Sequence, residues 1–532
     1  MSDALERLLA SVRNPIRYLG GEPNASRKDP SSAEVTCALC YPDLYEVGMS
    51  SLGLRILYGR LNELPQVVCE RFFAPEDDCE ELLRRQGIPL FTLESRLPVR
   101  SFDIVGFSLS SELNFTNFLN LLDLSGIPVR ASERTQKDPI VVLGGSCLFN
   151  PVPLEPFADL CVVGEGEEPL AEIAVRLSEV KGRPRGEVVS ALGEIDGVYA
   201  PANGRRQVSK RFVKDLDEAF FPVRWMTPLT EIVHDRISLE IMRGCGQGCR
   251  FCQALRCWKP VRHRSAERVI HLAREAYRSS GCSEISLLSF SSGDHPEIGR
   301  IVEGLVAEFR ELRVALSFPS LRIDTFSFSL ANRMREIRKT GLTFAPESSE
   351  RMRRSLGKEI SDGELVRLAG EAKRAGWRQI KLYFMVGLPG ETEDDLDGIV
   401  RLVREVSGVI SVKASFNTFV PRPHTPLERE RFITAEEYED KRTYLRSRLR
   451  SRYIEVKEHP WTMSAVEAFL SRGDEKAGSA LMRVWKAGGR FENWTEQFSF
   501  ERWREALAEE GIGFDQLSSG PRGELPWKFV RV

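Results

Sequence analysis

The chain has no long apolar run and almost no net charge. Its 532 residues include 75 Lys and Arg against 77 Asp and Glu, which leaves a formal net charge of −2. No overall field therefore marks it as a nucleic-acid or membrane-surface protein. No apolar stretch reaches membrane-spanning length. The segment MSDALERLLASVRNPIRYLGGE carries acidic residues early, unlike a secretory signal. We expect a cytoplasmic protein.

Histidine and cysteine are also scarce. The chain has six histidines, and all of them lie at or after His234, so that no imidazole precedes this position. It has eleven cysteines. Cysteines of a cytoplasmic protein stay reduced, and they are then more often core residues, metal ligands or catalytic groups than disulfides.

Short apolar runs alternate with amphipathic stretches from about residue 34 to residue 450. This rhythm predicts an α/β protein with parallel sheets. In the first block, 34–181, the expected strands are 34–40, 103–109, 139–145 and 159–165, and the helices between them include 50–63, 112–124 and 168–180. Strands and helices in this order indicate an N-terminal doubly wound sheet with helices on both faces.

The second block, 235–452, repeats the same unit six times. Its expected strands are 236–244, 284–290, 313–320, 341–347, 380–387 and 410–419. Six β/α units in a row predict a central partial (β/α)6 barrel of the TIM type, with chemistry at the C-terminal ends of the strands. The remaining parts are an N-terminal extension (1–33), a connecting region (182–234) and a helical, tryptophan-rich C-terminal region (453–532).

The most specific motif follows the first strand of this barrel. It reads RGCGQGCRFC (243–252) and spaces Cys245, Cys249 and Cys252 as C-x3-C-x2-C. Iron–sulfur clusters are held by cysteine thiolates, usually four. Three thiolates leave one iron with an open position, which a catalytic metal site keeps. A zinc site with Cys257 or His263 as fourth ligand is the alternative.

This loop resembles the signature of the radical S-adenosylmethionine (SAM) family, including the aromatic Phe251 before the third cysteine. The resemblance implies a [4Fe–4S] cluster whose open iron is chelated by the amino and carboxylate groups of SAM. One electron, from a donor of the flavodoxin or ferredoxin type, would cleave the C5′–S bond. The resulting 5′-deoxyadenosyl radical would take a hydrogen from the substrate. The protein's part is binding, orientation and exclusion of solvent.

Further motifs lie at the ends of the later strands, in the order that the resemblance implies for a SAM site. They are SSGD with Ser291, Ser292 and Asp294 for the methionine amine, SFPSLRID with Ser320 and Arg322 for the carboxylate or ribose, FAPES with Glu347 for ribose hydroxyls or charge balance, and FMVGLPGET with Gly387 for adenine. Each one alone would favour an ordinary loop or helix N-cap. Their order at successive strand ends favours the SAM site.

The first block resembles the cobalamin-binding domain that precedes many radical SAM cores. Tyr45 stands where that family has histidine, while Ser111, Gly144 and Gly145 match its later Ser and Gly-Gly elements and GEGEE (164–168) also matches. A neutral phenol is a poor cobalt ligand because its oxygen ionises only near pH 10. Two interpretations remain: cobalamin binds without a protein ligand below the cobalt, or the domain is a scaffold that docks substrate or partner.

The order of the blocks resembles a bacterial subfamily of cobalamin-domain radical SAM proteins. The resemblance implies an enzyme for C–H functionalisation, with cobalamin-assisted methyl transfer as one form. The alternatives are a non-turnover [4Fe–4S] and SAM-binding sensor or accessory protein, and an RNA-modifying enzyme. For RNA, the relevant feature is a basic run on a predicted helix: Lys441, Arg442, Arg446, Arg448, Arg450 and Arg452. It suits a phosphate-contacting stripe, but a solvated helix face is favoured.

Overall fold

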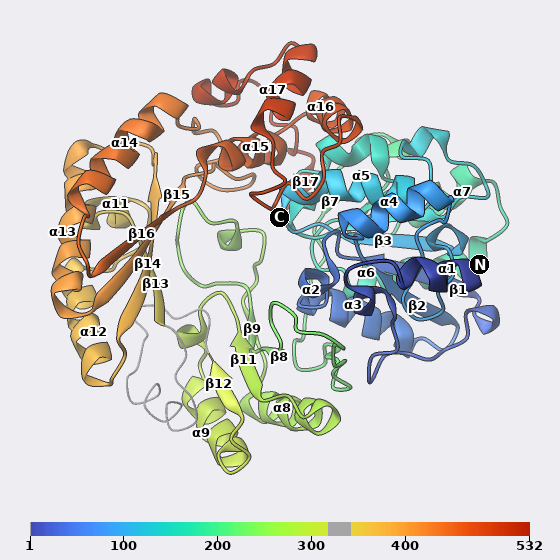
Figure 1. Ribbon diagram of the computed structural model, residues 1–532, viewed down its shortest axis with the longest axis horizontal. Helices are drawn as coiled ribbons and strands as arrows, with labels where there is room; N and C mark the ends of the chain where they lie inside the picture. Colours follow the sequence, from blue (N-terminus) through green and yellow to red (C-terminus); the bar gives the residue numbers. More distant parts are fainter. Residues whose placement is uncertain (1, 318–341) are drawn as a thin grey trace.

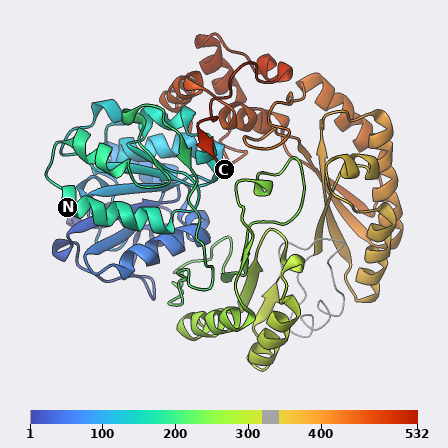
Figure 2. The same ribbon diagram turned by 180° about the vertical axis from the view of Figure 1, so that it is seen from behind.

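The computed structural model describes residues 2–317 and 342–532. The N-terminal sheet forms one lobe, the barrel strands form a second, and the C-terminal helices lie between the N-terminal sheet and the later barrel strands (Figures 1 and 2). The described part of the chain contains no helix that is long and apolar enough to cross a membrane.

The N-terminal sheet has six strands in the order β2-β1-β3-β4-β5-β6, and all neighbours are parallel except β5 and β6. The strands are β1 (Val35–Cys40), β2 (Val67–Phe72), β3 (Ile104–Ser108), β4 (Ile140–Gly144), β5 (Leu160–Val162) and β6 (Val198–Tyr199). The doubly wound sheet is confirmed. Its order corresponds to the flavodoxin-like variant, whose ligands bind beyond the carboxyl ends of β1 and β3.

Helices cover both faces of this sheet. The helices α3 (Leu52–Glu63), α6 (Glu167–Val180) and α7 (Arg185–Leu192) contribute to one apolar core, and α1 (Ser2–Leu9), α4 (Asp77–Gln86) and α5 (Phe115–Leu124) contribute to the other. The strand β2 was not predicted, because VVCERF carries Glu70 and Arg71 in its centre. Both side chains are buried and paired: Arg71 with Glu22 and Glu94, and Glu70 with Thr92.

The barrel strands form two parallel sheets of orders β12-β11-β8 and β13-β14-β15-β16. They are β8 (Ile237–Glu240), β11 (Glu284–Leu288), β12 (Ala315–Ser317), β13 (Leu342–Glu347), β14 (Gln379–Val386), β15 (Ser411–Thr418) and β16 (Ile454–Glu458). Within the described residues no pairing joins β12 to β13. The partial barrel is confirmed. The strand β16 adds a seventh unit, so the boundary expected at residue 452 leaves out a strand of the same sheet.

Helices follow the barrel strands β8, β11, β13, β14 and β15. These helices are α8 (Ala266–Ser280), α9 (Ile298–Phe309), α11 (Glu350–Ser355), α12 (Asp362–Arg374), α13 (Glu393–Val409) and α14 (Ala435–Arg448). Capping boxes begin α12 at Ser361 and α14 at Thr434, which satisfies the first backbone N–H groups of each helix. A short antiparallel pair, β9 (Met242–Arg243) and β10 (Arg262–His263), brackets the cysteine loop.

Of the C-terminal helices, α16 (Glu475–Lys486) packs on α5, α15 (Trp461–Ser471) packs on the short turn 112–114 before α5, and α17 (Phe500–Glu509) packs on α16. Trp503 and Leu481 belong to the same apolar core as α5. A Cβ on Gly478 would lie 2.7 Å from the Pro153 carbonyl oxygen, so only glycine permits this close approach. A final strand, β17 (Val530–Arg531), pairs with β7 (Val208–Ser209) of the connecting region.

Candidate functional site

The cysteine loop begins directly after β9 and folds back on itself. Gly244 adopts φ +87°, and a Cβ there would lie 2.5 Å from the Trp258 carbonyl oxygen. Cys245, Cys249 and Cys252 are each half-buried. The Cys252 amide donates to the Cys249 carbonyl at 3.1 Å. The loop is therefore compact, and all three thiols remain reachable from outside the core.

The three thiols share one electrostatic environment. Burial raises the pKa of Cys252, and thiolates at Cys249 and Cys245 raise it further. No three His, Cys, Asp or Glu side chains in residues 2–317 and 342–532 lie close enough for a single metal ion. Thiolates on an iron–sulfur cubane bind different irons, so they stand farther apart than the ligands of one ion.

The two residues that could complete a zinc site are engaged elsewhere. Cys257 is 3% exposed and belongs to the apolar core of the N-terminal lobe. The His263 ring meets the His295 ring edge-on, with centroids 5.3 Å apart. The structure gives the zinc alternative no support.

The motif after β11 touches the cysteine loop. Asp294 accepts a hydrogen bond from Gln247 Nε2 at 2.8 Å, and Gln247 lies between the first two cysteines. Ser291 and Ser292 are fully buried. The Ser292 hydroxyl lies 2.8 Å from the Ser289 hydroxyl, whereas Ser291 Oγ has no partner in the described structure. Buried hydroxyls are normally hydrogen-bonded, so Ser291 is suited to a ligand. Sequence reasoning missed Gln247, although its place between two cysteines could have indicated it.

Glu347 ends β13 in a strained conformation beside the cysteine loop. Its φ is +68°, unusual for a residue with a side chain. A register shift precedes it in the strand. Its carboxylate binds Lys358 Nζ at 2.8 Å, and its negative charge contributes to the raised pKa of Cys252. A non-glycine residue held in this region often belongs to a functional site.

Gly387 and Phe251 both contact residues at the ends of the later barrel strands. Gly387 has φ +83°, and its amide donates to Glu391 Oε2 at 2.9 Å. Phe251 packs against the apolar cluster of Met352, Leu356, Leu388, Phe419 and Leu427 at the ends of the later strands. Ser320 and Arg322 lie outside the described residues.

A cavity of about 580 Å³ lies at the carboxyl edge of the N-terminal sheet and is shared with the barrel. The sheet contributes Gly144 and Gly145, and the barrel side contributes Trp258 and Phe290. Gly145 has φ +108°, and a Cβ there would lie 2.3 Å from the Leu109 carbonyl oxygen. The cavity occupies the β1/β3 switch point, where such folds bind their ligands.

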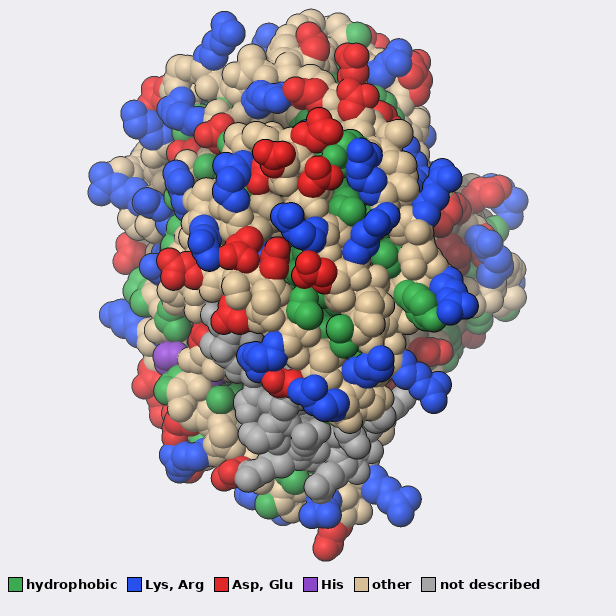
Figure 3. All heavy atoms as spheres, turned by 90° about the vertical axis from the view of Figure 1, so that its left-hand side faces the viewer, with side chains coloured by type: hydrophobic (Ala, Val, Ile, Leu, Met, Phe, Trp, Pro, Cys, Tyr) green, Lys and Arg blue, Asp and Glu red, His purple; other side chains and the backbone are tan. Residues whose placement is uncertain are grey.

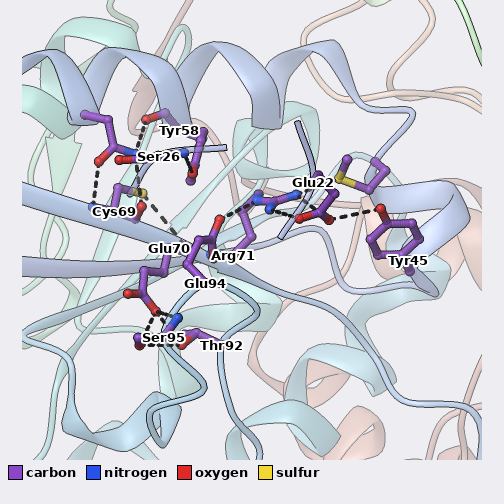
Figure 4. A network of polar contacts seen from close by, with 12 residues as sticks. Glu22, Ser26, Tyr45, Tyr58, Cys69, Glu70, Arg71, Thr92, Glu94 and Ser95 are labelled. Carbon is purple, nitrogen blue, oxygen red and sulfur yellow. Dashed lines mark hydrogen bonds and ion pairs between the residues drawn. The ribbon is translucent and has the colours of Figure 1, made fainter. Parts of the chain in front are cut away.

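The structure does not bring Tyr45 to this cavity. The phenol is 2% exposed, and its hydroxyl donates to Glu22 Oε1 at 3.0 Å, within a buried network around Arg71 (Figure 4). Burial, and then the charge of Glu22, raise the pKa of Tyr45 well above its usual range. Tyr45 therefore does not make the cobalamin contact that its motif position implies, because its hydroxyl is hydrogen-bonded to Glu22 in the core.

Ser111 also faces elsewhere. Its hydroxyl donates to Asn493 Oδ1 at 3.0 Å, in the C-terminal region. The neighbouring Ser110 lines the cavity instead, and its hydroxyl lies 2.8 Å from the Tyr41 hydroxyl. Sequence reasoning missed Ser110 and Tyr41, as well as the aromatic pair Trp258 and Phe290, whose ring centroids are 5.9 Å apart.

A buried ionic network joins the GEGEE loop to the β9–β10 pair. Glu165 binds Arg243 at 2.8 Å and Arg262 at 2.7 Å. Glu240 and Glu167 each bind Arg243 at 2.8 Å. Burial alone would raise the pKa of Glu165, but the two guanidinium groups hold it below its usual range. Because Arg243 stands two residues before Cys245, this network ties the cluster loop to the cavity of the N-terminal sheet.

The helix of the basic run, α14, ends at Arg448, so Arg450 and Arg452 lie beyond it, and the residues of the run that lie on the helix have acidic partners. Lys441 binds Glu391 at 2.7 Å, Arg442 binds Glu458 at 2.9 Å, and Arg446 lies 3.7 Å from the same carboxylate. The face that α13 and α14 form carries both signs of charge interspersed (Figure 3). This arrangement is typical of a solvated helix face.

Comparison with known proteins identifies two family models in the chain. "Radical SAM proteins, N-terminal" matches residues 53–201, and "Radical SAM superfamily" matches residues 239–403. The uncharacterized protein MJ0966 of Methanocaldococcus jannaschii is 27% identical over 447 residues, which cover 84% of this chain and 90% of that protein. The anaerobic magnesium-protoporphyrin IX monomethyl ester cyclase of Cereibacter sphaeroides is 25% identical over 311 residues, 54% of this chain and 48% of the cyclase.

Solved structures share the fold. The radical SAM methyltransferase TsrM of Kitasatospora setae, with cobalamin and a [4Fe–4S] cluster bound, matches with a TM-score of 0.51 at 15% identity, over 74% of this chain and 77% of TsrM. The cobalamin-dependent radical enzyme OxsB matches with a TM-score of 0.50 at 16% identity, over 78% of this chain and 56% of OxsB. A [4Fe–4S] cluster and SAM are the cofactors of the family matched here. The chain is a radical SAM protein with an N-terminal cobalamin-binding-like domain.

Proposed function

We propose that the chain is an enzyme that functionalises a C–H bond of its substrate by cobalamin-assisted methyl transfer. When bound, the cluster and SAM supply a 5′-deoxyadenosyl radical, and cobalamin supplies a methyl carrier. One observation carries the proposal. The cavity at the edge of the N-terminal sheet is closed on its other side by Trp258 and Phe290, which adjoin the cysteine loop and the SSGD motif. A ligand there would stand next to the SAM site.

The residues of the barrel have separate roles in this proposal. Cys245, Cys249 and Cys252 hold the cluster. Gln247 fixes Asp294 through their 2.8 Å hydrogen bond, so that the carboxylate is oriented toward the amine of SAM. The unpartnered Ser291 hydroxyl offers a further polar contact. Preorganised groups of this kind orient the reacting atoms without reorganisation during the reaction.

The cavity of the N-terminal sheet suits cobalamin by its shape rather than by a metal ligand. Gly144 leaves open space above the sheet edge, since a Cβ there would meet only Val162, at 4.0 Å. Tyr45 is engaged with Glu22. We therefore propose that cobalamin binds without a protein ligand below the cobalt. The solved structures of TsrM and OxsB with cobalamin bound support this choice of ligand.

The test is anaerobic purification of the full chain from cobalamin-fed cells, followed by metal analysis and turnover. We expect about four irons per chain and cobalt at near unit occupancy. With SAM and dithionite, or a reduced flavodoxin or ferredoxin, we expect 5′-deoxyadenosine, and cell extract should acquire a methyl group from labelled SAM. No 5′-deoxyadenosine, with or without extract, would refute the enzyme and leave the sensor or accessory role. 5′-Deoxyadenosine without cobalt would refute the methyl carrier alone.

The RNA-modifying alternative has one source of support. One relative, the tRNA-2-methylthio-N(6)-dimethylallyladenosine synthase of Sorangium cellulosum, is named for an RNA product; it is 26% identical over 213 residues. The basic run that would contact phosphates is ion-paired on α14. Separation of the labelled extract into RNA, protein and small-molecule fractions distinguishes these substrates.

A further inference from the structure

A second cavity, away from the sheet edge, has no part in the proposed function. Its volume is about 1190 Å³, and it lies between α3 and α8, bordered by residues 24–28 and by the connecting segment 218–226. Glu167 is the one residue that lines both this cavity and the cavity at the sheet edge. The walls of the two cavities are otherwise distinct, so a ligand here would be a second one.

Of the six Lys and Arg side chains that line this cavity, Arg60 pairs with Glu63. The other five are Arg27, Lys28, Arg55, Arg224 and Arg268. In the described part of the chain none of these five forms an ion pair, and Lys28 and Arg268 donate to backbone carbonyls.

The acidic residues of the lining are nearly all neutralised. Glu63 pairs with Arg60, Glu167 with Arg243, Glu168 with Arg211, and Glu275 with Arg278, at 2.8 to 3.2 Å. Only Glu218 of this lining has no ion-pair partner within the described ranges. The cavity therefore has an excess of positive charge, although the whole chain has a net charge of −2.

Arg55 places one of these charges deep in the wall. Its side chain is buried, with the residue 6% exposed. Nε donates to the Met49 carbonyl at 2.9 Å and Nη1 to the Met226 carbonyl at 2.6 Å. The guanidinium lies over the Trp225 ring, 4.5 Å from its centroid. Burial, and then the charge of Arg71, lower the pKa of Arg55 to about 10. A buried charge without a counter-charge is costly, and a bound anion would remove that cost.

We propose that this cavity is a binding site for a small polyphosphate anion, held by Arg55 at its wall and by Arg27, Arg224 and Arg268 around it. The planar guanidinium donates two parallel N–H groups, which match phosphate oxygens. Several arginines around one cavity suit a ligand with more than one phosphate better than a single carboxylate. The volume is ample for such a ligand.

The experiment is calorimetric titration of the full chain with inorganic pyrophosphate. We expect saturable binding to the wild type, weakened about tenfold or more in the double variant Arg224→Gln/Arg268→Gln, because two charge-assisted contacts to the phosphates are lost. Binding should weaken further as salt rises. Arg504→Gln, which removes an exposed cation on α17 (61% exposed side chain), is the matched control and should bind like the wild type.

Two results would overturn the proposal: no saturable binding of pyrophosphate, or equal binding to the wild type and the double variant. The test leaves Arg55 unchanged, because its buried guanidinium also binds the Met49 and Met226 carbonyls, and it alters Arg224 and Arg268, neither of which is fully buried. Displacement of pyrophosphate by ADP would identify a nucleoside diphosphate as a source of the phosphates, and a lack of displacement would identify the inorganic ion.

Discussion

In the barrel, polar contacts join the loops around the proposed SAM site: Gln247 donates to Asp294, and Lys358 binds Glu347. At the edge of the N-terminal sheet, the cavity is shaped by backbone, with Gly145 pressed against a neighbouring carbonyl group. The first region is specified by residue types that sequence motifs record. The second is specified by the absence of side chains and by packing. A substitution that changes the chemical type of one side chain should therefore disrupt the barrel site. A substitution that adds volume should disrupt the cavity at the edge of the N-terminal sheet.

The largest effect should follow the loss of one thiol. In Cys249→Ser we expect iron to fall from about four per chain to less than about one, and 5′-deoxyadenosine formation to fall at least about 100-fold, which corresponds to about 2.7 kcal/mol. A serine hydroxyl is a poor replacement for a thiolate on iron. Cys257→Ser is the control, since Cys257 lies in the apolar core. Iron lost equally from both variants would contradict the assignment of the ligands.

The second effect concerns the network that joins the two regions. Glu165→Gln leaves the buried Arg243 and Arg262 without their shared charge, and we expect a loss of stability of about 3–5 kcal/mol at pH 7. The folded pKa of Glu165 is lowered, so its contribution is present above the unfolded pKa and is lost as the pH falls below about 4.5. Wild type and variant should therefore converge below that pH in denaturant titrations. A constant gap from pH 7 to pH 3 would argue against the ion pairs.

The third effect separates two adjacent glycines. Gly145→Ala places a Cβ 2.3 Å from a carbonyl oxygen at φ +108°, and we expect a loss of about 3 kcal/mol or more in the first unfolding transition. Gly144→Ala adds a Cβ whose nearest neighbour, Val162 Cβ, is 4.0 Å away, so stability should change by less than about 1 kcal/mol. The larger Gly144→Leu should fold but retain less cobalamin. Equal stability of the two alanine variants would contradict the description of this edge.

The smallest effect tests the position of Tyr45. Tyr45→Phe removes one hydrogen bond to Glu22, and we expect a loss of about 1 kcal/mol. Tyr45→His restores the residue type of the cobalamin-binding family, but its imidazole would occupy the core beside Glu22. We expect no hyperfine splitting from a histidine nitrogen in the electron paramagnetic resonance spectrum of cob(II)alamin. A splitting that changes when histidine is labelled with nitrogen-15 would show that the side chain reaches the cofactor.

The sequence was informative where chemistry depends on residue type. The cysteine spacing, SSGD and FAPES lie at strand ends, where the alternation of apolar runs predicted them. It failed where tertiary contacts override local pattern. The charges of β2 conceal a buried strand because their partners Glu22 and Glu94 lie far along the chain. Tyr45 and Ser111 occupy matching motif positions, but Glu22 and Asn493 draw their hydroxyls away from the cavity.

The packing of the C-terminal helices on the N-terminal lobe determines when that lobe can complete its folding during synthesis of the chain. Asn117 accepts a hydrogen bond from the Phe491 amide, across 374 residues of sequence, and Asp43 accepts one from Trp494 Nε1, across 451. At about 5–20 residues per second, a ribosome needs roughly 20–75 s to make the residues between Asn117 and Phe491. During that interval the apolar face of α5 that packs against the C-terminal helices stays uncovered, while the barrel and its cysteine loop are being synthesised. Insertion of the cluster and final closure of the N-terminal lobe can therefore be separate events in the life of each chain.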